Sequence, residues 1–188
     1  MFEDLRKVCK VVGAAGGVEG RKRFQKMVHI MKSMGFEFDE KYLWGNYGPY
    51  STNLAQEIAL LVENNYLEET QAGVGFKPYS YCLTESGKAF LNKVKETSSE
   101  LFSCNDELIR ISKLLSDSDV NKLELLSTCM FAWEEDEDIE SMVSLVNHLK
   151  DKFQEGARRY VELTDRLMRT SSLKERVDML EEMKKELK

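Results

Sequence analysis

The sequence of 188 residues predicts a mainly α-helical protein with a small β-hairpin, divided into an N-terminal domain at 1–96 and an all-α region at 97–188. Apolar residues recur every three or four positions along most of the chain, which is typical of helices that bury one face. Large and polar residues alternate in two short runs within 66–83, which indicates two paired strands. Apolar residues make up 42% of the chain, enough to form a core.

A first helix is predicted at the N-terminus and is expected to end at Gly13. The glycine-rich segment 13–20, GAAGGVEG, comes next. It follows a helix rather than a strand and lacks the Gly-Lys-Ser/Thr that contacts phosphate and metal in a P-loop, so we interpret it as a flexible connector. The apolar stripe of the first helix comprises Phe2, Leu5, Val8, Cys9 and Val12.

A second helix is predicted over 20–34, because apolar residues follow the helical period there and Gly35 fits its end. The opposite face of this helix is basic. The next segment, FEFDEKYLW at 36–44, alternates in a way that indicates extended backbone. The apolar positions of the helix are Phe24, Met27, Val28 and Met31, and the basic positions are Arg21, Lys22, Arg23 and Lys26.

The turn GNYGPYS at 45–51 sets the start of a third helix. Pro49 fixes its own φ and disfavours helical backbone at Gly48, so the helix cannot begin before Tyr50. Ser51 or Thr52 can then accept hydrogen bonds from the first free amides as the N-cap. The apolar face of this helix, which we expect to share one core with Met27 and Met31, comprises Leu54, Ile58, Leu61 and Val62.

A β-hairpin is predicted after the third helix. Tyr66 and Leu67 enter one strand, residues 71–78 form a loop, and the alternating residues of 79–83 form the second strand. Thr84 then fits the N-cap of another helix. Three helices, a hairpin and a helix in this order are typical of a winged-helix domain, in which the hairpin is the wing and the third helix can enter a groove of DNA.

Two segments resemble known protein families. YSYCLTESGKAFL, at 79–91, resembles the segment from wing to helix that is common in winged-helix regulators, with an aromatic residue, Leu-Thr, two residues and Gly. GRKRFQKMVHIMKSMGFEF and WGNYGPYSTNLAQEI resemble the YwgA-like family of uncharacterised prokaryotic proteins. They are more distantly similar to the antitoxin-associated Panacea domain, which has a Lys-Leu-Gln-Lys-like helix before a Tyr-Gly-Pro turn. Over 20–95 the resemblance implies a winged-helix fold, without a settled function.

The leading functional hypothesis is a winged-helix regulator of transcription that binds duplex DNA through its N-terminal domain. The third helix would contact bases, and the second helix and the wing would hold phosphates. Two features count against this hypothesis. Residues 49–66, which include the third helix, contain no Lys or Arg. About fifteen residues separate the second helix from the third, whereas the two helices of a helix-turn-helix are joined by three or four. The candidate base contacts are Ser51, Thr52, Asn53 and Gln56, and the candidate phosphate contacts are Arg21, Lys22, Arg23, Lys26 and Lys77.

The alternative hypothesis is a winged-helix module that binds protein, such as an antitoxin-like or defence-associated adaptor. Trp44, Tyr47 and Tyr50 are its candidate contacts, because aromatic residues anchor many protein interfaces. They also fit a purely structural role around the turn. Residues 1–96 carry 13 Lys and Arg against 12 Asp and Glu, whereas residues 97–188 carry 14 against 21. Contact with nucleic acid is therefore expected only in the first half.

Catalysis is the least favoured of the three functions, because the sequence has no nucleophile elbow, HExxH motif or phosphate loop. The two histidines, His29 and His148, and the four widely spaced cysteines fit no zinc motif, so we predict no metal, no cofactor and reduced thiols. No apolar run approaches the roughly 18 residues of a membrane span, and the first residues do not form a signal peptide. We expect a cytoplasmic protein without a membrane partner.

The second half is predicted to be helical throughout, with an acidic loop, EEDEDIE, at 134–140 and a break at RTSSLK, where Ser171 or Ser172 can cap a helix. The last helix carries an apolar stripe that includes Leu173, Val177 and Leu180. Such a stripe offers a self-complementary surface if the chain does not already bury it. We therefore predict a homodimer formed through the C-terminal helices.

Overall fold

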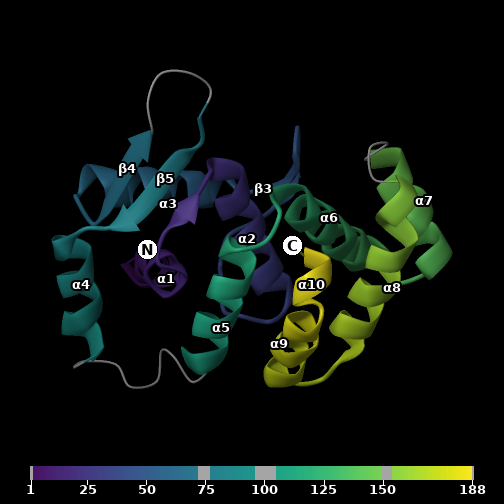
Figure 1. Ribbon diagram of the computed structural model, residues 1–188. Helices are drawn as coiled ribbons and strands as arrows, with labels where there is room; N and C mark the ends of the chain where they lie inside the picture. Colours follow the sequence, from purple (N-terminus) through teal and green to yellow (C-terminus); the bar gives the residue numbers. More distant parts are fainter. Residues whose placement is uncertain (1, 72–76, 96–104, 150–153, 188) are drawn as a thin grey trace.

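The structure is a computed structural model that describes residues 2–71, 77–95, 105–149 and 154–187 (Figure 1). Its first half contains the helices α1 (Phe2–Ala15), α2 (Arg21–Ser33), α3 (Thr52–Glu63) and α4 (Glu85–Lys95). Its strands are β1 (Val18–Glu19), β2 (Leu43–Gly45), β3 (Gly48–Tyr50), β4 (Leu67–Gln71) and β5 (Tyr79–Leu83). The second half contains α5 (Asn105–Ser116), α6 (Val120–Glu135), α7 (Ile139–Leu149), α8 (Gln154–Arg169), α9 (Leu173–Glu182) and α10 (Lys184–Leu187).

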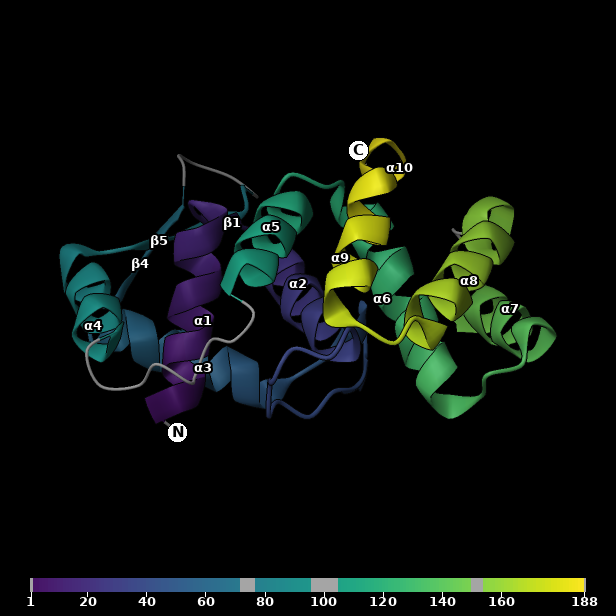
Figure 2. The ribbon, with the colours of Figure 1, turned by 90° about the horizontal axis from the view of Figure 1, so that it is seen from below.

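The strands form two small antiparallel sheets. One has the order β1, β5, β4, with Val18 opposite Tyr81 and Leu67 opposite Leu83. The other is the tight hairpin of β2 and β3. Figures 1 and 2 show the first sheet and α4 at one end of an elongated molecule, and α7 and α8 at the other end. The predicted class, mainly helical with a small hairpin, is confirmed.

The two halves of the chain are packed against each other. Helix α5 lies against α1, and α6 lies against α2 and β3. Helices α7 and α8 cover the far side of α6, and α9 contacts α5 and α8. The buried apolar side chains of both halves form one continuous cluster. The predicted domain boundary at 96 and most of the predicted loop at 71–78 lie outside the described residues.

The structure corrects two expectations about the glycine-rich segment. Helix α1 runs on to Ala15, so Gly13 lies inside the helix rather than at its end. The segment that we expected to be a flexible connector contains β1, which adds a third strand to the sheet. Gly17 makes this close pairing feasible, because it adopts φ 125° and a Cβ there would lie 3.3 Å from the carbonyl oxygen of Tyr81.

The turn before α3 is held as predicted, with Ser51 as the N-cap. Its hydroxyl oxygen accepts a hydrogen bond from the amide of Leu54 at 3.2 Å. The segment 36–42 is not a strand, although Phe36 and Phe38 are buried. Strand pairing begins only at Leu43, where β2 meets β3.

The C-terminal stripe is buried within the chain. Val177 and Leu180 have no exposed surface, and Leu173 packs against the same core. Of the two serines predicted as possible caps, Ser172 is the N-cap of α9. Because α9 contacts α5 and α8, this stripe is not available as a dimer surface. A homodimer stays a prediction and would need a different surface.

The predicted core of α2 and α3 is confirmed, because Leu54, Ile58, Leu61, Met27 and Met31 are all buried in one cluster. We expect Ile58→Ala to lower the free energy of unfolding by about 2 to 5 kcal/mol, through lost contacts and the cavity left behind. Urea denaturation measures this, with the exposed Gln56→Ala on the same helix as control. An Ile58→Ala melting curve identical to that of the wild type would contradict the assignment.

Candidate functional site

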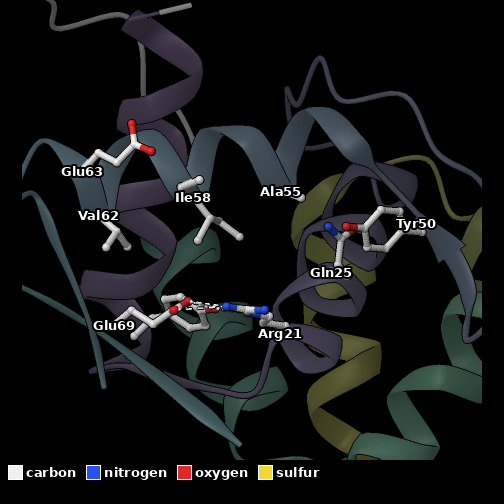
Figure 3. Close-up of a pocket in the computed structure, with 10 residues that line it drawn as sticks. Arg21, Gln25, Tyr50, Ala55, Ile58, Val62, Glu63 and Glu69 are labelled. Carbon is white, nitrogen blue, oxygen red and sulfur yellow. Dashed lines mark hydrogen bonds and ion pairs between the residues drawn. The ribbon is translucent and has the colours of Figure 1, made fainter. Parts of the chain in front are cut away.

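The candidate site is a cleft between α2, α3, the β2–β3 hairpin and the edge of the larger sheet. It consists of two cavities of about 610 Å³ and 410 Å³, and both are lined by Arg21, Gln25 and Tyr50. Figure 3 shows Ile58 and Val62 pointing from α3 towards Arg21, while Gln25 and Tyr50 lie together at the other end of the smaller cavity. Concave sites that combine apolar walls with a few polar groups are typical ligand sites.

Arg21 lies at the boundary of the two cavities and is held by a polar network. Its Nη2 donates to the carboxylate of Glu69 at 3.1 Å, and its Nε donates to the hydroxyl of Tyr81 at 3.1 Å. The Tyr81 hydroxyl in turn donates to Glu69. The guanidinium lies 4.0 Å from the centre of the Tyr79 ring. The hydrogen bond that Arg21 donates to Tyr81, together with its interaction with Glu69, raises the pKa of Arg21, so its charge is fixed.

The surroundings of Tyr81 also change the pKa of its hydroxyl. Burial raises the pKa of Tyr81 to about 12, and its hydrogen bond to Glu69 acts in the same direction. Tyr81 therefore stays protonated at neutral pH and donates to the carboxylate. The result is a rigid, internally neutral wall rather than an acid or base ready for catalysis.

Helix α2 fixes the entry of α3 through Gln25 and Lys26. The side-chain amide of Gln25 donates to the Ser51 carbonyl at 2.9 Å and accepts from the Ser51 amide at 2.9 Å. The ammonium of Lys26 donates to the Pro49 carbonyl at 2.6 Å. Lys26 is 2% exposed and Ser51 is fully buried. Both were predicted to contact DNA, and their burial gives them a structural role instead.

Two further predicted phosphate contacts are engaged within the fold. The guanidinium of Arg23 donates to the carbonyls of Ser116, the last residue of α5, and Ser118, which follows the helix, and so joins the two halves of the chain. Lys22 forms an ion pair with Glu124, which α6 buries completely. The Lys22 ammonium also lies 5.7 Å from the centre of the Tyr47 ring.

The remaining predicted nucleic-acid contacts are on the surface. Thr52, Asn53 and Gln56 are exposed on the first turns of α3. Lys77 is exposed just before β5, and its carbonyl accepts a hydrogen bond from Gln71. Three of the four predicted base contacts are therefore accessible, whereas Ser51 is buried and most of the predicted phosphate contacts are engaged within the protein.

The predicted partner-binding aromatics differ in their surroundings. Trp44 is 37% exposed and its ring packs against Phe131 of α6, at 5.7 Å between centroids. Tyr47 and Tyr50 are 66% and 44% exposed. Leu43 is opposite Tyr50 in the hairpin and is 76% exposed. Cross-strand partners share one face of a sheet, so Leu43 and Tyr50 lie on one face of the hairpin. We call these two residues and the exposed turn residue Tyr47 the hairpin surface.

Sequence reasoning missed Leu43 as well as Glu69 and Tyr81 in the Arg21 network. Leu43 lies in a segment that is predicted to be extended. Nothing in the local sequence distinguishes this exposed residue from Phe36 and Phe38, which are buried. The contact of Arg21 with Glu69 spans 48 positions of sequence. Only the strand pairing of the folded chain brings these groups together.

A serine–histidine pair lies in the core and is closed to solvent. Ser127 Oγ and His29 Nδ1 are 2.9 Å apart, and neither residue is more than 1% exposed. Burial lowers the pKa of His29 to about 3, so its imidazole is neutral. A nucleophile and base need access to a substrate, and this pair has none, so we assign it a structural role.

The described residues contain no cluster of three His, Cys, Asp or Glu side chains suited to a metal ion. Cys9, Cys82 and Cys129 are free thiols, and Cys104 lies outside the described part of the chain. Within the same residues no helix combines the length and apolar character that crossing a membrane requires.

The fold and cleft define a mainly helical protein with two small antiparallel sheets and a binding-type cavity beside one hairpin. No protein-family model matches the chain. The chain is similar to the uncharacterised protein YwgA of Bacillus subtilis (strain 168), with 42% identity over 93 residues. The matched region covers 49% of this chain and 56% of YwgA. This similarity supports the resemblance to a YwgA-like family and carries no assigned activity.

Proposed function

We propose that this chain is a winged-helix module that binds a partner protein through the hairpin surface. The order α1, β1, α2, α3, β4, β5, α4, into which the β2–β3 hairpin is inserted between α2 and α3, supports the winged-helix assignment, as does the three-stranded sheet. The exposed Leu43, Tyr47 and Tyr50 carry the functional proposal. Exposed aromatic and apolar groups beside a cleft are typical of protein interfaces, in which a few such residues supply most of the binding energy.

The electrostatics of the first half also favour a protein partner over DNA. Arg21 and Lys22 are paired with Glu69 and Glu124, while Arg23 and Lys26 bind backbone carbonyls. DNA affinity depends on cations that can exchange counterions for phosphates. Arg23 and Lys26 are therefore not available to phosphates, and the ion-paired Arg21 and Lys22 alone offer few contacts to an extended phosphate backbone.

We expect single substitutions in the hairpin surface to weaken partner binding about tenfold or more while leaving the fold intact. Leu43→Ser and Tyr47→Ser test this, because both side chains point into solvent. The partner is captured from native extract with the full chain, identified, purified and titrated against each variant by calorimetry. Leu60→Ser, an exposed apolar residue of α3 that lines neither cavity, is the matched control. Equal affinity for wild type, Leu43→Ser and Tyr47→Ser would reject the proposal.

Duplex-DNA binding is the second candidate function, because Thr52, Asn53 and Gln56 remain exposed on α3 and Lys77 on the wing. Asn and Gln side chains can read adenine edges in the major groove. The decisive observation is retention on duplex DNA at low ionic strength that falls as salt is added. Retention with such a salt dependence would favour this candidate, and its absence would leave the protein-binding module.

A further inference from the structure

The two cavities of the cleft differ in charge. The larger one has Arg21, Lys22 and Lys26 in its lining and no carboxylate, and we call it the cationic compartment. The smaller one is walled by apolar residues of α3, and we call it the α3 compartment. Arg21, Gln25 and Tyr50 line both, so a single extended segment can occupy the two compartments together.

We propose that the cleft binds an acidic peptide segment of the partner, with a carboxylate side chain in the cationic compartment and a neighbouring apolar side chain in the α3 compartment. This proposal rests on the protein-binding function proposed above and specifies the chemistry of its partner. Two residues of the hairpin surface belong to the same cleft, because Tyr47 lines the cationic compartment and Tyr50 lines both compartments.

Charge complementarity favours an acid in the cationic compartment. The Arg21 side chain is 62% exposed and the Lys22 side chain is 28% exposed, so both are accessible although each is already paired. An incoming carboxylate would meet these cations with no acidic side chain in the lining to repel it. A basic side chain in the same place would face like charges, and such contacts discriminate strongly between partners.

The α3 compartment favours an apolar side chain rather than an acidic one. Ala55, Ile58, Ala59 and Val62 supply its apolar wall. Glu63 and Glu69 also line this compartment and disfavour an acidic side chain of the peptide there. A cavity of about 410 Å³ has room for a leucine or phenylalanine side chain, whose burial is favourable. The positions of the acid and the apolar group along the cleft are therefore not interchangeable.

The experiment is a selection of random peptides displayed on phage against the immobilised full chain. Selected peptides are synthesised with a fluorescent label and titrated by anisotropy. We expect the selected sequences to combine an Asp or Glu with a large apolar residue a few positions away. Replacing that acid by Lys, or that apolar residue by Ser, is expected to weaken binding about tenfold or more. Added salt is expected to weaken binding of the acidic peptide.

A pair of neighbouring α3 substitutions localises the binding. Ala59→Glu places a carboxylate on the wall of the α3 compartment and is expected to weaken peptide binding about tenfold or more. Leu60→Glu adds the same charge at the next position, outside both linings, and is expected to bind as the wild type does. Circular dichroism melting of both variants shows that they are folded.

Several outcomes would overturn the acidic assignment. These are selection of basic or uncharged peptides, no selected peptide at all, equal effects of Ala59→Glu and Leu60→Glu, or displacement of the peptide by a duplex oligonucleotide. Peptides of different chemistry that still lose affinity for Leu43→Ser would leave the protein-binding function standing. Failure of the hairpin substitutions to affect the captured partner would instead remove that function itself.

Discussion

Replacing Gly87 by alanine is expected to destabilise the protein by about 3 kcal/mol or more. Gly87 lies in the first turn of α4, and a Cβ there would come within 2.1 Å of the Tyr66 carbonyl oxygen and 3.0 Å of the Leu83 side chain. The obstructing atom is backbone and cannot rotate away. The Tyr66 oxygen also accepts a hydrogen bond from the Thr84 amide at 3.1 Å, so a shift breaks the cap of α4.

Urea denaturation of Gly87→Ala measures this loss. Ser86→Ala is the matched control, because Ser86 is the exposed neighbour in the same turn. In a helix without tertiary contacts, alanine is about 1 kcal/mol more favourable than glycine. A Gly87→Ala variant as stable as the wild type would mean that α4 does not approach Tyr66 so closely.

The second large effect is expected when the stability of the protein is measured as a function of pH. Glu40, in the segment between α2 and β2, is 2% exposed and interacts with Glu57 of α3. Burial, and after it the charge of Glu40, raises the pKa of Glu57 from 4.5 to about 8. Burial also raises the pKa of Glu40, and Asp4 of α1 acts in the same direction, while Lys32 opposes it.

The folded protein therefore binds more protons than the unfolded chain between about pH 4.5 and 8. Stability from Glu57 is fully present below pH 4.5 and is lost as the pH rises through about 8. One pKa unit corresponds to about 1.4 kcal/mol, and the partial exposure of Glu57 reduces the total, so we expect a loss of about 2 kcal/mol.

Denaturation at a series of pH values tests this, with Glu57→Gln as the diagnostic variant. Glutamine resembles the protonated carboxyl, so the loss of stability between about pH 4.5 and 8 is expected to become smaller. Glu63→Gln, an exposed position on the same helix, is expected to keep the wild-type profile. A Glu57→Gln variant that loses as much stability as the wild type between about pH 4.5 and 8 would contradict the interpretation.

The local signals of the sequence were sufficient for most elements of the fold. Pro49 and Ser51 marked the start of α3 because a fixed φ and a capping hydroxyl act within a few residues. The Leu-Thr-x-x-Gly pattern at 83–87 also has a local basis. The Thr84 hydroxyl accepts a hydrogen bond from the Gly87 amide at 3.0 Å, and glycine allows the close approach to Tyr66.

The candidate site was predicted less well, because a basic residue looks the same in sequence whether it is solvated or engaged. Arg23 and Lys26 have the spacing of an exposed helical face, yet they hold α5 and the turn before α3. The partner of Lys22 is Glu124, about a hundred positions away. Likewise, the stripe at Val177 and Leu180 gave no sign that α5 and α8 would cover it.

By itself, the sequence determined the helical class, the wing-like hairpin, the start of α3 and the residues of its core face, because periodicity, capping and turn chemistry act over a few residues. Tertiary structure alone decided which charges remain accessible and which apolar side chains stay exposed. It paired Arg21 with Glu69, buried Lys26, and left Leu43 beside Tyr50 on the surface. The physical reason is that burial and ion pairing depend on contacts between segments distant in the chain, which no local pattern records.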